Sequence, residues 1–453
     1  MVNGTTHSAV RLVGINKRFG AVAANADVNL SIRAGTVHGI VGENGAGKST
    51  LMSVLYGFYQ ADSGGIEVDG KPVHIRNSDD AIALGIGMVH QHFMLVDTLT
   101  ALENIMLGAE PHWLLHRADT MVRRALEQLM QDTGLHVKLD ALVGDLPVGD
   151  QQRLEILKAL YRGAKVLILD EPTAVLTPQE TSHLFKVLGH LRSQGTTILL
   201  ITHKLKEVMG LCDFVTVMRA GRVVQEMAIA DASIESLAEA MVGRKVQMGR
   251  VDESPKGAGD VLLSLRGAEV RDSLNVVRLS GINLQLRAGE IVGVAGVSGN
   301  GQSELLDVLS GLLVPHAGEL SLGGRNFGPS AWLSPLTARS LRLAHVPEDR
   351  HARAMVMAFS AWESAVLGYE SLPDYNVGGW MNHRAMRDAT QRMMERFDVR
   401  PPNPELGSRK FSGGNQQKLV LARELGQLPQ VLLVGQPPRG VDIGAIDFIY
   451  SQL

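Results

Sequence analysis

The sequence predicts an α/β protein that contains two tandem copies of one fold, each built on a mostly parallel β-sheet. Three observations predict this fold class. Segment 31–57 reappears as segment 285–311, and GDQQRLEILKAL from Gly149 reappears as GNQQKLVLAREL from Gly414. Short apolar, β-branched runs end in loops and alternate with helical segments, which is typical of parallel strands covered on both faces. A glycine-rich loop follows the first run and precedes a helical segment.

The elements of the first copy follow from local patterns. Strands of the sheet are expected within segments 37–41, 85–91, 166–172 and 196–203, and helices over 120–131 and 178–193. Asp69 and Gly70 predict a tight antiparallel turn, and a second hairpin is expected from Val215. Residues 101–145 are expected to form an inserted helical subdomain. Each copy therefore combines a sheet core with an antiparallel β subdomain and a helical subdomain.

The domain boundaries follow from a change in composition. The first copy is expected at 1–243 and the second at 261–453, joined by a polar linker with glycine and proline at 244–260. The first copy continues from Glu171 to its end at residue 243, whereas the chain ends soon after the matching Gln436. We therefore expect the second copy to lack its final strands, as in a truncated reading frame or a natural short form.

Composition narrows the function classes. With 44 Lys and Arg against 47 Asp and Glu, the formal net charge of -3 favours no nucleic-acid partner. No run of eighteen apolar residues predicts a membrane span. The single cysteine, Cys212, is interpreted as a small buried apolar residue. A hydrophobic content of 45% predicts a large core or a docking surface for another protein.

The glycine-rich loop carries the first chemical signal, the complete pattern G-x-x-x-x-G-K-[ST]. Its backbone N–H groups and the following helix N-terminus would hold a phosphate chain, with Lys48 on the β- and γ-phosphates and Ser49 on Mg²⁺. A turn without a ligand is the alternative, which the strand–loop–helix context disfavours. The expected ATP-binding residues of this loop are Gly42, Glu43, Asn44, Gly45, Ala46, Gly47, Lys48, Ser49 and Thr50.

A pair of carboxylates ends the strand predicted at 166–172. Asp170 is expected to hold Mg²⁺, and Glu171 to orient and polarise an attacking water. An Asp-Glu pair alone could equally cap a helix. Behind a complete phosphate loop, the catalytic interpretation is favoured.

The order of phosphate loop, Gln91, LPVGDQQ, Asp170-Glu171 and His203 is similar to the ATP-binding subunits of ABC transporters. The resemblance implies two P-loop NTPase domains that bind ATP between them, each site pairing one domain's loop with the other domain's signature segment. It implies that Phe19 stacks on adenine, that His203 contacts the γ-phosphate and that Gln91 couples Mg²⁺ and water to the helical subdomain. The signature residues facing the first loop would be Ser412, Gly413, Gly414 and Gln416, with Asp442 crossing from the same copy.

The second site implied by this pairing lacks its working groups. Gln302 replaces Lys48, Gly435 and Gln436 replace the carboxylates, and Glu348 aligns with Gln91, while Pro147 and Val148 stand in the facing signature. Losing a lysine charge about 4 Å from phosphate removes on the order of 4 kcal/mol of Coulomb attraction at an effective dielectric of about 20. We therefore expect one catalytic and one degenerate site.

The tandem layout resembles bacterial importers for sugars or nucleosides, and PTAVLTP with LVGQPPRG resembles the basic-membrane-lipoprotein-associated systems. The resemblance implies ATP and Mg²⁺ as ligands, and ATP hydrolysis at the cytoplasmic face of the cell membrane. It also implies transmembrane permease subunits and, through them, a substrate-binding protein or lipoprotein. These two segments favour a nucleoside over a sugar as the transported solute, without deciding between the two.

Two interpretations stay open at this point. Residues 92–108 are expected either to pack in the core or to receive the membrane subunit, and the KLKE segment at Lys204 is interpreted as a solvated helix face.

The alternative function is a soluble tandem ABC protein that acts on ribosomes as a translation factor. Such chains generally keep both sites intact and carry a long charged linker.

Overall fold

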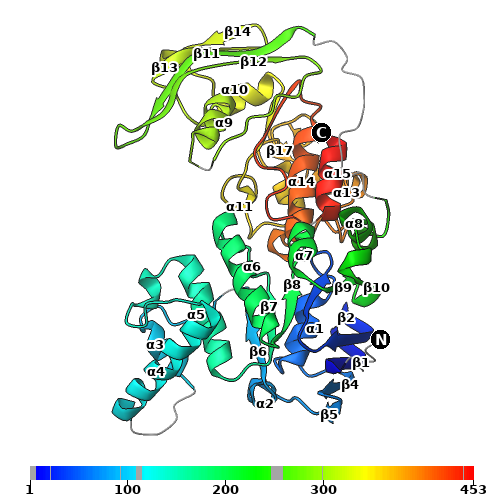
Figure 1. The fold of residues 1–453 in the computed structure, drawn as a ribbon. Coiled ribbons are helices and arrows are strands. Elements are labelled where there is room, and N and C mark those ends of the chain that lie inside the picture. Colours follow the sequence, from blue (N-terminus) through cyan, green and yellow to red (C-terminus); the bar gives the residue numbers. More distant parts are fainter. Residues whose placement is uncertain are drawn as a thin grey trace. The chain divides into compact units, whose positions relative to one another are not determined.

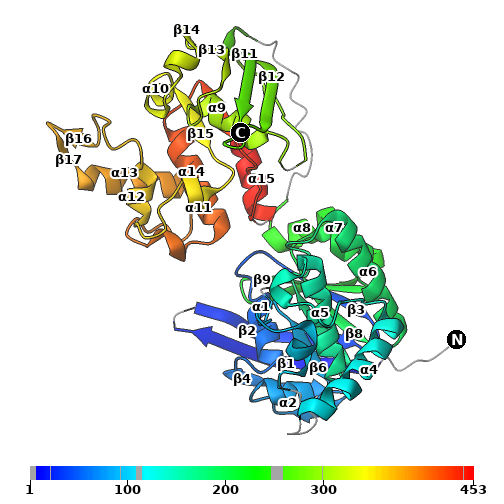
Figure 2. The same ribbon diagram turned by 90° about the vertical axis from the view of Figure 1, so that its left-hand side faces the viewer.

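The computed structural model describes residues 7–20, 22–91, 93–108, 115–245, 259–297, 299–441 and 443–453. The chain divides into two compact units, Met1–Gln247 and Met248–Leu453, and each is described by itself (Figures 1 and 2). The expected linker at 244–260 spans this division, and its residues 246–258 lie outside the described residues. Among the helices described, none combines the length and apolarity needed to cross a bilayer.

The sheet of the first unit has the strand order β10-β9-β3-β8-β7-β6. Its neighbours from β9 to β6 are parallel, and β10 pairs with β9 in the antiparallel direction. Every residue of β3, β7 and β8 is buried, as expected for strands covered on both faces. The strands are β3 (Val37–Val41), β6 (Ile86–Val89), β7 (Val166–Asp170), β8 (Thr197–Ile201), β9 (Phe214–Arg219) and β10 (Arg222–Ala228).

An antiparallel sheet lies beside this core, with the order β2-β1-β4-β5. Its strands are β1 (Ser8–Phe19), β2 (Val22–Arg33), β4 (Ser63–Val68) and β5 (Lys71–Val73). Asp69 and Gly70 both have positive φ angles, 50° and 73°, which confirms the tight hairpin predicted there. Side chains from this sheet pack with those of α1 (Lys48–Leu55) in one hydrophobic core.

Helices gather on one side of the strands in the first unit (Figure 1). They are α3 (Ala101–Met106), α4 (Leu115–Thr133) and α5 (Val148–Tyr161), which confirms the helical subdomain and extends it beyond residue 145. Helix α6 covers Pro178–Ser193 as predicted, because Thr177 and Glu180 form a capping box at its start. The remaining helices are α2 (Ser78–Ala83), α7 (Leu205–Leu211) and α8 (Ile234–Val242), with short 3₁₀ turns η1 (Val143–Asp145) and η2 (Ile229–Asp231).

The second unit repeats this plan in its β subdomain and its helices. Its antiparallel sheet has the order β12-β11-β13-β14, with β11 (Val261–Arg271), β12 (Val277–Arg287), β13 (Ala317–Leu322) and β14 (Arg325–Phe327). Figure 2 shows its helices α11 to α14 apart from that sheet. The helices are α9 (Gln302–Ser310), α10 (Pro335–Ser340), α11 (Arg350–Arg353), α12 (Ala361–Val366), α13 (His383–Arg396), α14 (Gly413–Gly426) and α15 (Ile443–Gln452), with 3₁₀ turns η3 (Pro329–Ala331) and η4 (Ser408–Lys410) and hairpin strands β16 (Asn376–Val377) and β17 (Trp380–Met381).

The parallel sheet is where the two units differ. In the described part of the second unit, parallel pairing joins only β15 (Leu343–Val346) and β18 (Val431–Val434), the counterparts of β6 and β7. Residues 291–297, the counterpart of β3, form no strand, and Ile291 is 85% exposed. In the first unit β3 bonds to β8 and β9, whereas no described strand of the second unit pairs with residues 291–297. An apolar segment without strand partners leaves its backbone groups to water.

Candidate functional site

The phosphate loop connects β3 to α1 in a shape that requires glycine. Gly45 and Gly47 have φ angles of 84° and 94°, in the left-handed region. A Cβ atom at Gly47 would lie 2.2 Å from the carbonyl oxygen of Ala24, and one at Gly42 would lie 2.3 Å from that of Met218. A side chain at Gly42 or Gly47 would therefore clash with neighbouring backbone, so only glycine fits these two positions.

Lys48 lies at the start of α1 and is curled back over the loop. Its side chain is buried, and Nζ donates hydrogen bonds to the carbonyl oxygens of Gly42 at 2.8 Å and Glu43 at 3.0 Å. These carbonyl groups hold the ammonium at the mouth of the loop. Phosphate oxygens can replace them as acceptors with little movement of the side chain, because an ammonium group has three donors.

Asp170 and Ser49 supply oxygen atoms beside the loop. Burial raises the pKa of Asp170, while a hydrogen bond from Ser49 and the charge of Lys48 partly oppose that shift. The charge of Glu171 adds to the raised pKa, and a bound cation would offset the cost of ionising Asp170 there. A hydroxyl and a carboxylate are hard oxygen ligands of the kind that Mg²⁺ prefers, so the pair fits a magnesium ion.

Glu171 and His203 form the central contact of the first unit. The Nδ1 atom of His203 lies 2.9 Å from Oε1 of Glu171. Burial opposes ionisation of Glu171, but the hydrogen bond with His203 and the charges of His203, Lys48 and Lys204 lower its pKa below the usual value. Glu171 is therefore ionised at neutral pH and keeps its second oxygen, Oε2, for another donor.

Two further predicted residues border the site. Phe19 is 44% exposed and packs edge-on against Tyr59 with ring centroids 5.1 Å apart, a platform on which an adenine ring can stack. Gln91 is exposed on the loop after β6. Because β3, β6, β7 and β8 are parallel, their carboxyl ends meet at one edge of the sheet. That edge brings together the phosphate loop, Gln91, Asp170, Glu171 and His203.

The signature segment of the second unit forms the N-terminus of α14. Ser412 is the exposed N-cap residue and accepts a hydrogen bond from the N–H of Asn415, and Gly413 and Gly414 begin the helix. Gln416 is buried, and its Nε2 donates to the carbonyl oxygens of Ser408 and Phe411 at 3.1 and 3.2 Å. The side chain of Gln416 therefore supports the segment from behind instead of pointing outward. Asp442 lies outside the described residues.

The first unit keeps the same support but not the hydroxyl. Gln151 donates to the carbonyl oxygens of Val143 and Leu146 at 3.2 and 3.0 Å, as Gln416 does in the second unit. Pro147 takes the N-cap position of α5 and makes no side-chain cap. The scaffold of this signature segment is thus intact while its anion-binding hydroxyl is lost.

The phosphate-loop counterpart in the second unit keeps the backbone conformation but lacks the side chains that would bind a nucleotide. Gly299 and Gly301 have φ angles of 90° and 95°, close to those of Gly45 and Gly47. Gln302, however, donates to the carbonyl oxygen of Val297. Both oxygens of Glu348 are occupied, one by the hydroxyl of Ser303 and the other by Nε2 of Gln436 at 2.9 Å. Ser303 and Gln436, the counterparts of Ser49 and Glu171, are therefore both bonded to a carboxylate of the chain itself.

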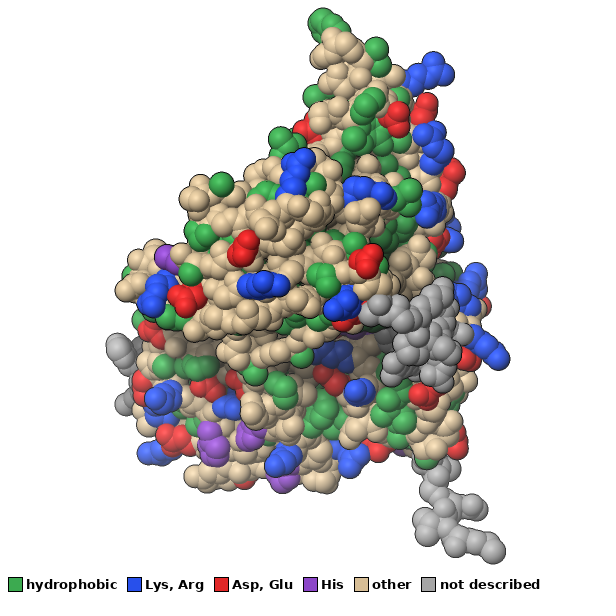
Figure 3. All heavy atoms as spheres, turned by 90° about the horizontal axis from the view of Figure 1, so that it is seen from above, with side chains coloured by type: hydrophobic (Ala, Val, Ile, Leu, Met, Phe, Trp, Pro, Cys, Tyr) green, Lys and Arg blue, Asp and Glu red, His purple; other side chains and the backbone are tan. Residues whose placement is uncertain are grey.

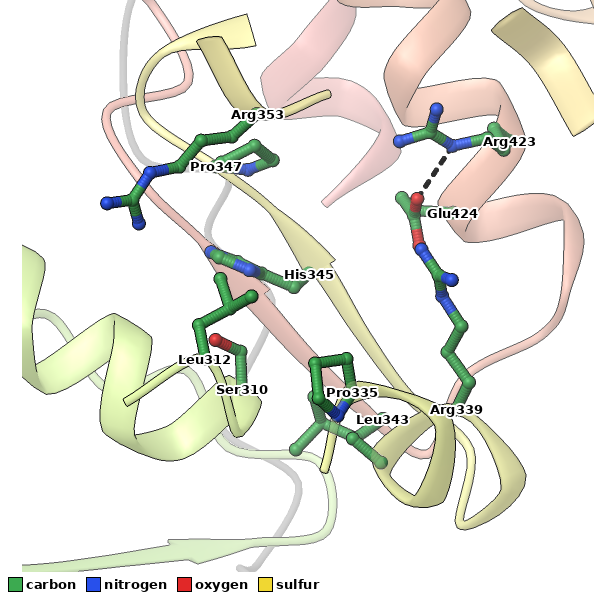
Figure 4. Close-up of a pocket in the computed structure, with 11 residues that line it drawn as sticks. Ser310, Leu312, Pro335, Arg339, Leu343, His345, Pro347, Arg353, Arg423 and Glu424 are labelled. Carbon is green, nitrogen blue, oxygen red and sulfur yellow. Dashed lines mark hydrogen bonds and ion pairs between the residues drawn. The ribbon is translucent and has the colours of Figure 1, made fainter. Parts of the chain in front are cut away.

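Each unit also contains a cavity at an equivalent place in the fold. In the second unit it has a volume of about 100 Å³ and lies among α9, α10, β15 and α14, where Arg339, Arg353, Arg423, Glu424 and His345 line it (Figure 4). Figure 4 shows Arg423 bonded to Glu424 at 2.8 Å. The residues of the second unit's phosphate-loop counterpart do not line this cavity.

The cavity of the first unit is larger, about 350 Å³, and lies among α1, α2, β6 and α5. Rings of Tyr56, Phe58 and His90 pack together at centroid distances of 5.2 to 6.1 Å. Met94 is 60% exposed at its rim, whereas Ala101, Leu102 and Ile105 of α3 are buried. The core-packing interpretation of segment 92–108 is therefore confirmed for these residues of α3, whereas contact with a membrane subunit stays a prediction. Sequence reasoning missed Tyr56 and Phe58, which the alignment of the two copies could have shown to differ from Ser310 and Leu312.

On the face seen in Figure 3, Lys and Arg side chains are interspersed with Asp and Glu side chains, without a broad patch of one sign.

Cys212 is buried, as expected from the sequence, and burial raises the pKa of its thiol to about 12. This thiol is therefore not ionised at neutral pH and takes no part in the site.

Comparison with known proteins agrees with this geometry. Residues 26–174 and 279–437 match the family model described as ABC transporter. The nucleoside import ATP-binding protein NupA of Lactococcus lactis subsp. cremoris (strain MG1363) is 40% identical over 448 residues, which cover 98% of this chain and 87% of NupA. The guanosine import ATP-binding protein NupO of Bacillus subtilis (strain 168) is 41% identical over 98% of this chain and 86% of NupO.

A ribose import ATP-binding protein, RbsA of Chromobacterium violaceum (strain ATCC 12472), is 37% identical over 97% of this chain and 86% of RbsA. All three relatives are import ATP-binding proteins, and none of their names supports the translation-factor alternative. The family match covers most of both units. This chain therefore belongs to the ABC transporter family, as one of its ATP-binding, ATP-hydrolysing subunits.

Proposed function

We propose that this protein powers the import of a nucleoside or a monosaccharide and that it hydrolyses ATP at the site of its first unit. One observation carries the proposal. The first unit pairs an ionised Glu171 with His203 beside a complete phosphate loop, whereas the second unit has Gln436 bonded to Glu348. The relatives named above import nucleosides, guanosine or ribose, and so support both solute classes.

In the proposed mechanism, the loop backbone holds the phosphate chain and Lys48 moves its ammonium from Gly42 and Glu43 to phosphate oxygens. Ser49 and Asp170 would hold Mg²⁺, which offsets the charge on the β- and γ-phosphates when it is bound. Glu171 orients the attacking water through Oε2, because Oε1 is taken by His203. His203 keeps that carboxylate in place and presents its other ring nitrogen to the γ-phosphate. Phe19 stacks on the adenine and Gln91 lies beside the phosphates.

The signature segment of the second unit is proposed to complete this ATP site during turnover. Its support is Ser412, an exposed residue that caps the N-terminus of α14, where the helix dipole favours an anion. The first unit's equivalent position is Pro147, which has no hydroxyl and no N–H. Ser412→Ala is therefore expected to reduce the rate of ATP turnover, and Pro147→Ala is expected to change that rate little.

The proposed partners are transmembrane permease subunits at the cytoplasmic face of the cell membrane, and through them a substrate-binding protein or lipoprotein. We propose that a permease segment contacts the first unit's cavity, because Phe58 and Met94 expose apolar side chains there. Phe58→Ser is expected to weaken co-purification with the permease at least tenfold without loss of nucleotide binding. Val224→Ser, at an exposed apolar residue of β10, is the matched control.

The test of the catalytic proposal uses the purified full chain. Glu171→Gln is expected to abolish ATP turnover while nucleotide binding persists, because a neutral amide cannot accept the proton of water. Gln302→Lys in the second unit is expected to change turnover less than twofold. Ordinary turnover by the Glu171→Gln variant would overturn the assignment of the site. Uptake of labelled guanosine against labelled ribose by membranes containing the whole transporter then decides the solute class.

A further inference from the structure

Lys204 is not a freely solvated residue of a helix face, contrary to the expectation from its sequence. It is the N-cap residue of α7, and its side chain turns toward the loop that follows β7. Nζ donates to the carbonyl oxygen of Thr173 at 2.9 Å and to its Oγ1 at 3.0 Å, and lies 3.3 Å from Oε1 of Glu207. One lysine thus joins the loop after β7 to the first turn of α7.

Thr173 and Glu207 close this arrangement. Thr173 is 2% exposed, and its hydroxyl lies 2.7 Å from each carboxylate oxygen of Glu207, to which it donates. The same hydroxyl accepts from Lys204, so its donor and one acceptor site are both used. Glu207 lies in the first turn of α7, where the helix dipole favours a negative charge. We refer to Lys204, Thr173 and Glu207 together as the Lys204 bridge.

The Lys204 bridge spans the two segments that carry the catalytic pair. Glu171 stands two residues before Thr173, and His203 directly precedes Lys204. At the inner side of the pair, the N–H of Glu171 donates to the carbonyl oxygen of Ile201 at 2.9 Å. At the outer side, the Lys204 bridge makes the second connection. The 2.9 Å contact between Glu171 and His203 therefore has a hydrogen bond to Ile201 on one side and the Lys204 bridge on the other.

Glu171 needs such support because of its backbone. Its φ angle is 47°, in the left-handed region that residues with side chains seldom adopt. A residue in this conformation persists only where its surroundings determine it. The segment after Glu171 therefore requires an anchor, and Thr173 is the buried residue of that segment with bonds to another element.

We propose that Lys204, Thr173 and Glu207 are positioning residues for ATP hydrolysis, which hold Glu171 and His203 in register without touching ATP. The proposal rests on the proposed function of the first unit. The second unit offers a comparison within the same chain: Pro438 stands at the position of Thr173, so that the hydroxyl is lost where the glutamate is also lost. There, Gln436 has a similar positive φ angle, 42°, but bonds to Glu348.

The experiment measures ATP hydrolysis by the full chain. Lys204→Met keeps the length of the side chain and removes its donors, and is expected to lower kcat by about tenfold to a hundredfold, the usual effect of a small misplacement of catalytic groups. KM for ATP and the affinity for ATP in the absence of turnover are expected to change less than twofold. Lys204→Arg, which can donate to the same oxygens, is expected to restore most of kcat. Lys206→Met, two residues along α7 and exposed, is the matched control.

A second variant guards against a simple folding defect. Thr173→Ser keeps the hydroxyl and is expected to stay active, whereas Thr173→Val is expected to lose kcat to the same degree as Lys204→Met. Unchanged kcat in Lys204→Met overturns the proposal, and so does a loss of ATP affinity that matches the loss of kcat. If Glu171→Gln abolishes turnover and Lys204→Met does not alter it, only the positioning role falls. If Glu171→Gln remains active, the proposed function itself falls.

Discussion

Glu171 and His203 meet at 2.9 Å although 32 residues separate them along the chain. They meet because β7 and β8 are neighbours in a parallel sheet, with Asp170 paired to Ile201 at the ends of the two strands. The residues that follow each strand are thereby placed side by side. This relationship makes the carboxylate of Glu171 depend on an imidazole from a different element.

Loss of His203 is therefore expected to disable hydrolysis. In His203→Ala, Glu171 loses the hydrogen bond that orients Oε1, and we expect kcat to fall by about a hundredfold. ATP affinity is expected to fall much less, because the loop and Lys48 remain. Steady-state ATPase assays beside equilibrium binding check this. His183→Ala, at an exposed histidine of α6, serves as the control; a His203→Ala variant as active as this control would contradict the role of the pair.

The two units are expected to respond differently when their loops are altered. Lys48→Ala removes an ammonium from the phosphate site, and up to roughly a thousandfold loss of ATP affinity follows from the Coulomb energy at an effective dielectric of about 20. Gln302→Ala removes a neutral side chain that bonds to the backbone of Val297, so affinity is expected to stay within twofold. Titration with a fluorescent ATP analogue measures both. Equal losses in the two variants would show that the second loop also binds the triphosphate.

The glycines of the loop are expected to differ in their tolerance of a side chain. Gly47→Ala places Cβ against the carbonyl oxygen of Ala24 and also strains a φ angle of 94°, so ATP binding and stability should both be lost. Gly45→Ala meets no atom within 4 Å, and only the strain of its positive φ angle remains, roughly 1–2 kcal/mol. Thermal unfolding with and without ATP compares them. A Gly47→Ala variant as stable as Gly45→Ala would show that β2 yields to the added atom.

A buried histidine is expected to make the first unit sensitive to acid. Burial and the charge of Arg33 lower the pKa of His38 to about 4, and its Nε2 lies 2.7 Å from Oγ1 of Thr216. The unfolded chain binds this proton near pH 6.5, so the folded state binds fewer protons between pH 6.5 and 4. Stability is therefore full above pH 6.5 and falls as the pH is lowered through that window, by about 3 kcal/mol in total.

Replacement of that histidine provides the check. His38→Gln keeps a polar side chain of similar reach but does not titrate, so its stability should change less between pH 7 and pH 5 than that of the unchanged chain. Calorimetry at both pH values measures the difference. A pH dependence that is the same in both proteins would show that other groups cause the acid sensitivity.

Several features could be predicted from the sequence because short-range chemistry specifies them. The phosphate loop with its helix forms one local pattern and the carboxylates at the end of β7 form another, and the structure places each at the end of a parallel strand. Helix α6 has the predicted bounds, and the structure shows why it begins there, because Thr177 and Glu180 form a capping box and Pro178 occupies the first helical position. The repeat predicted the second unit in the same way, down to the matching helices α5 and α14.

Other features could not be predicted, because they depend on residues distant in sequence. KLKE has the composition of a solvated helix face, and only the placement of α7 beside the loop after β7 gives Lys204 its partners in Thr173. GNQQ looks like a segment that presents all of its polar groups, but the fold turns Gln416 inward to hold the backbone of Ser408. Residues 291–295 repeat the apolar pattern of β3 but form no strand, since a strand also requires neighbours.

By itself, the sequence determined that this chain contains two copies of one nucleotide-binding fold, and it assigned the groups proposed for hydrolysis to one copy. Those groups are encoded in contiguous motifs, whose geometry follows from local backbone preferences and from the strand and helix on either side. Only the tertiary structure decided which side chains hold Glu171 and His203 together, because their partners come from the ends of two different strands. Hydrogen bonds of that kind depend on how parallel strands are paired, and pairing is a property of the whole sheet.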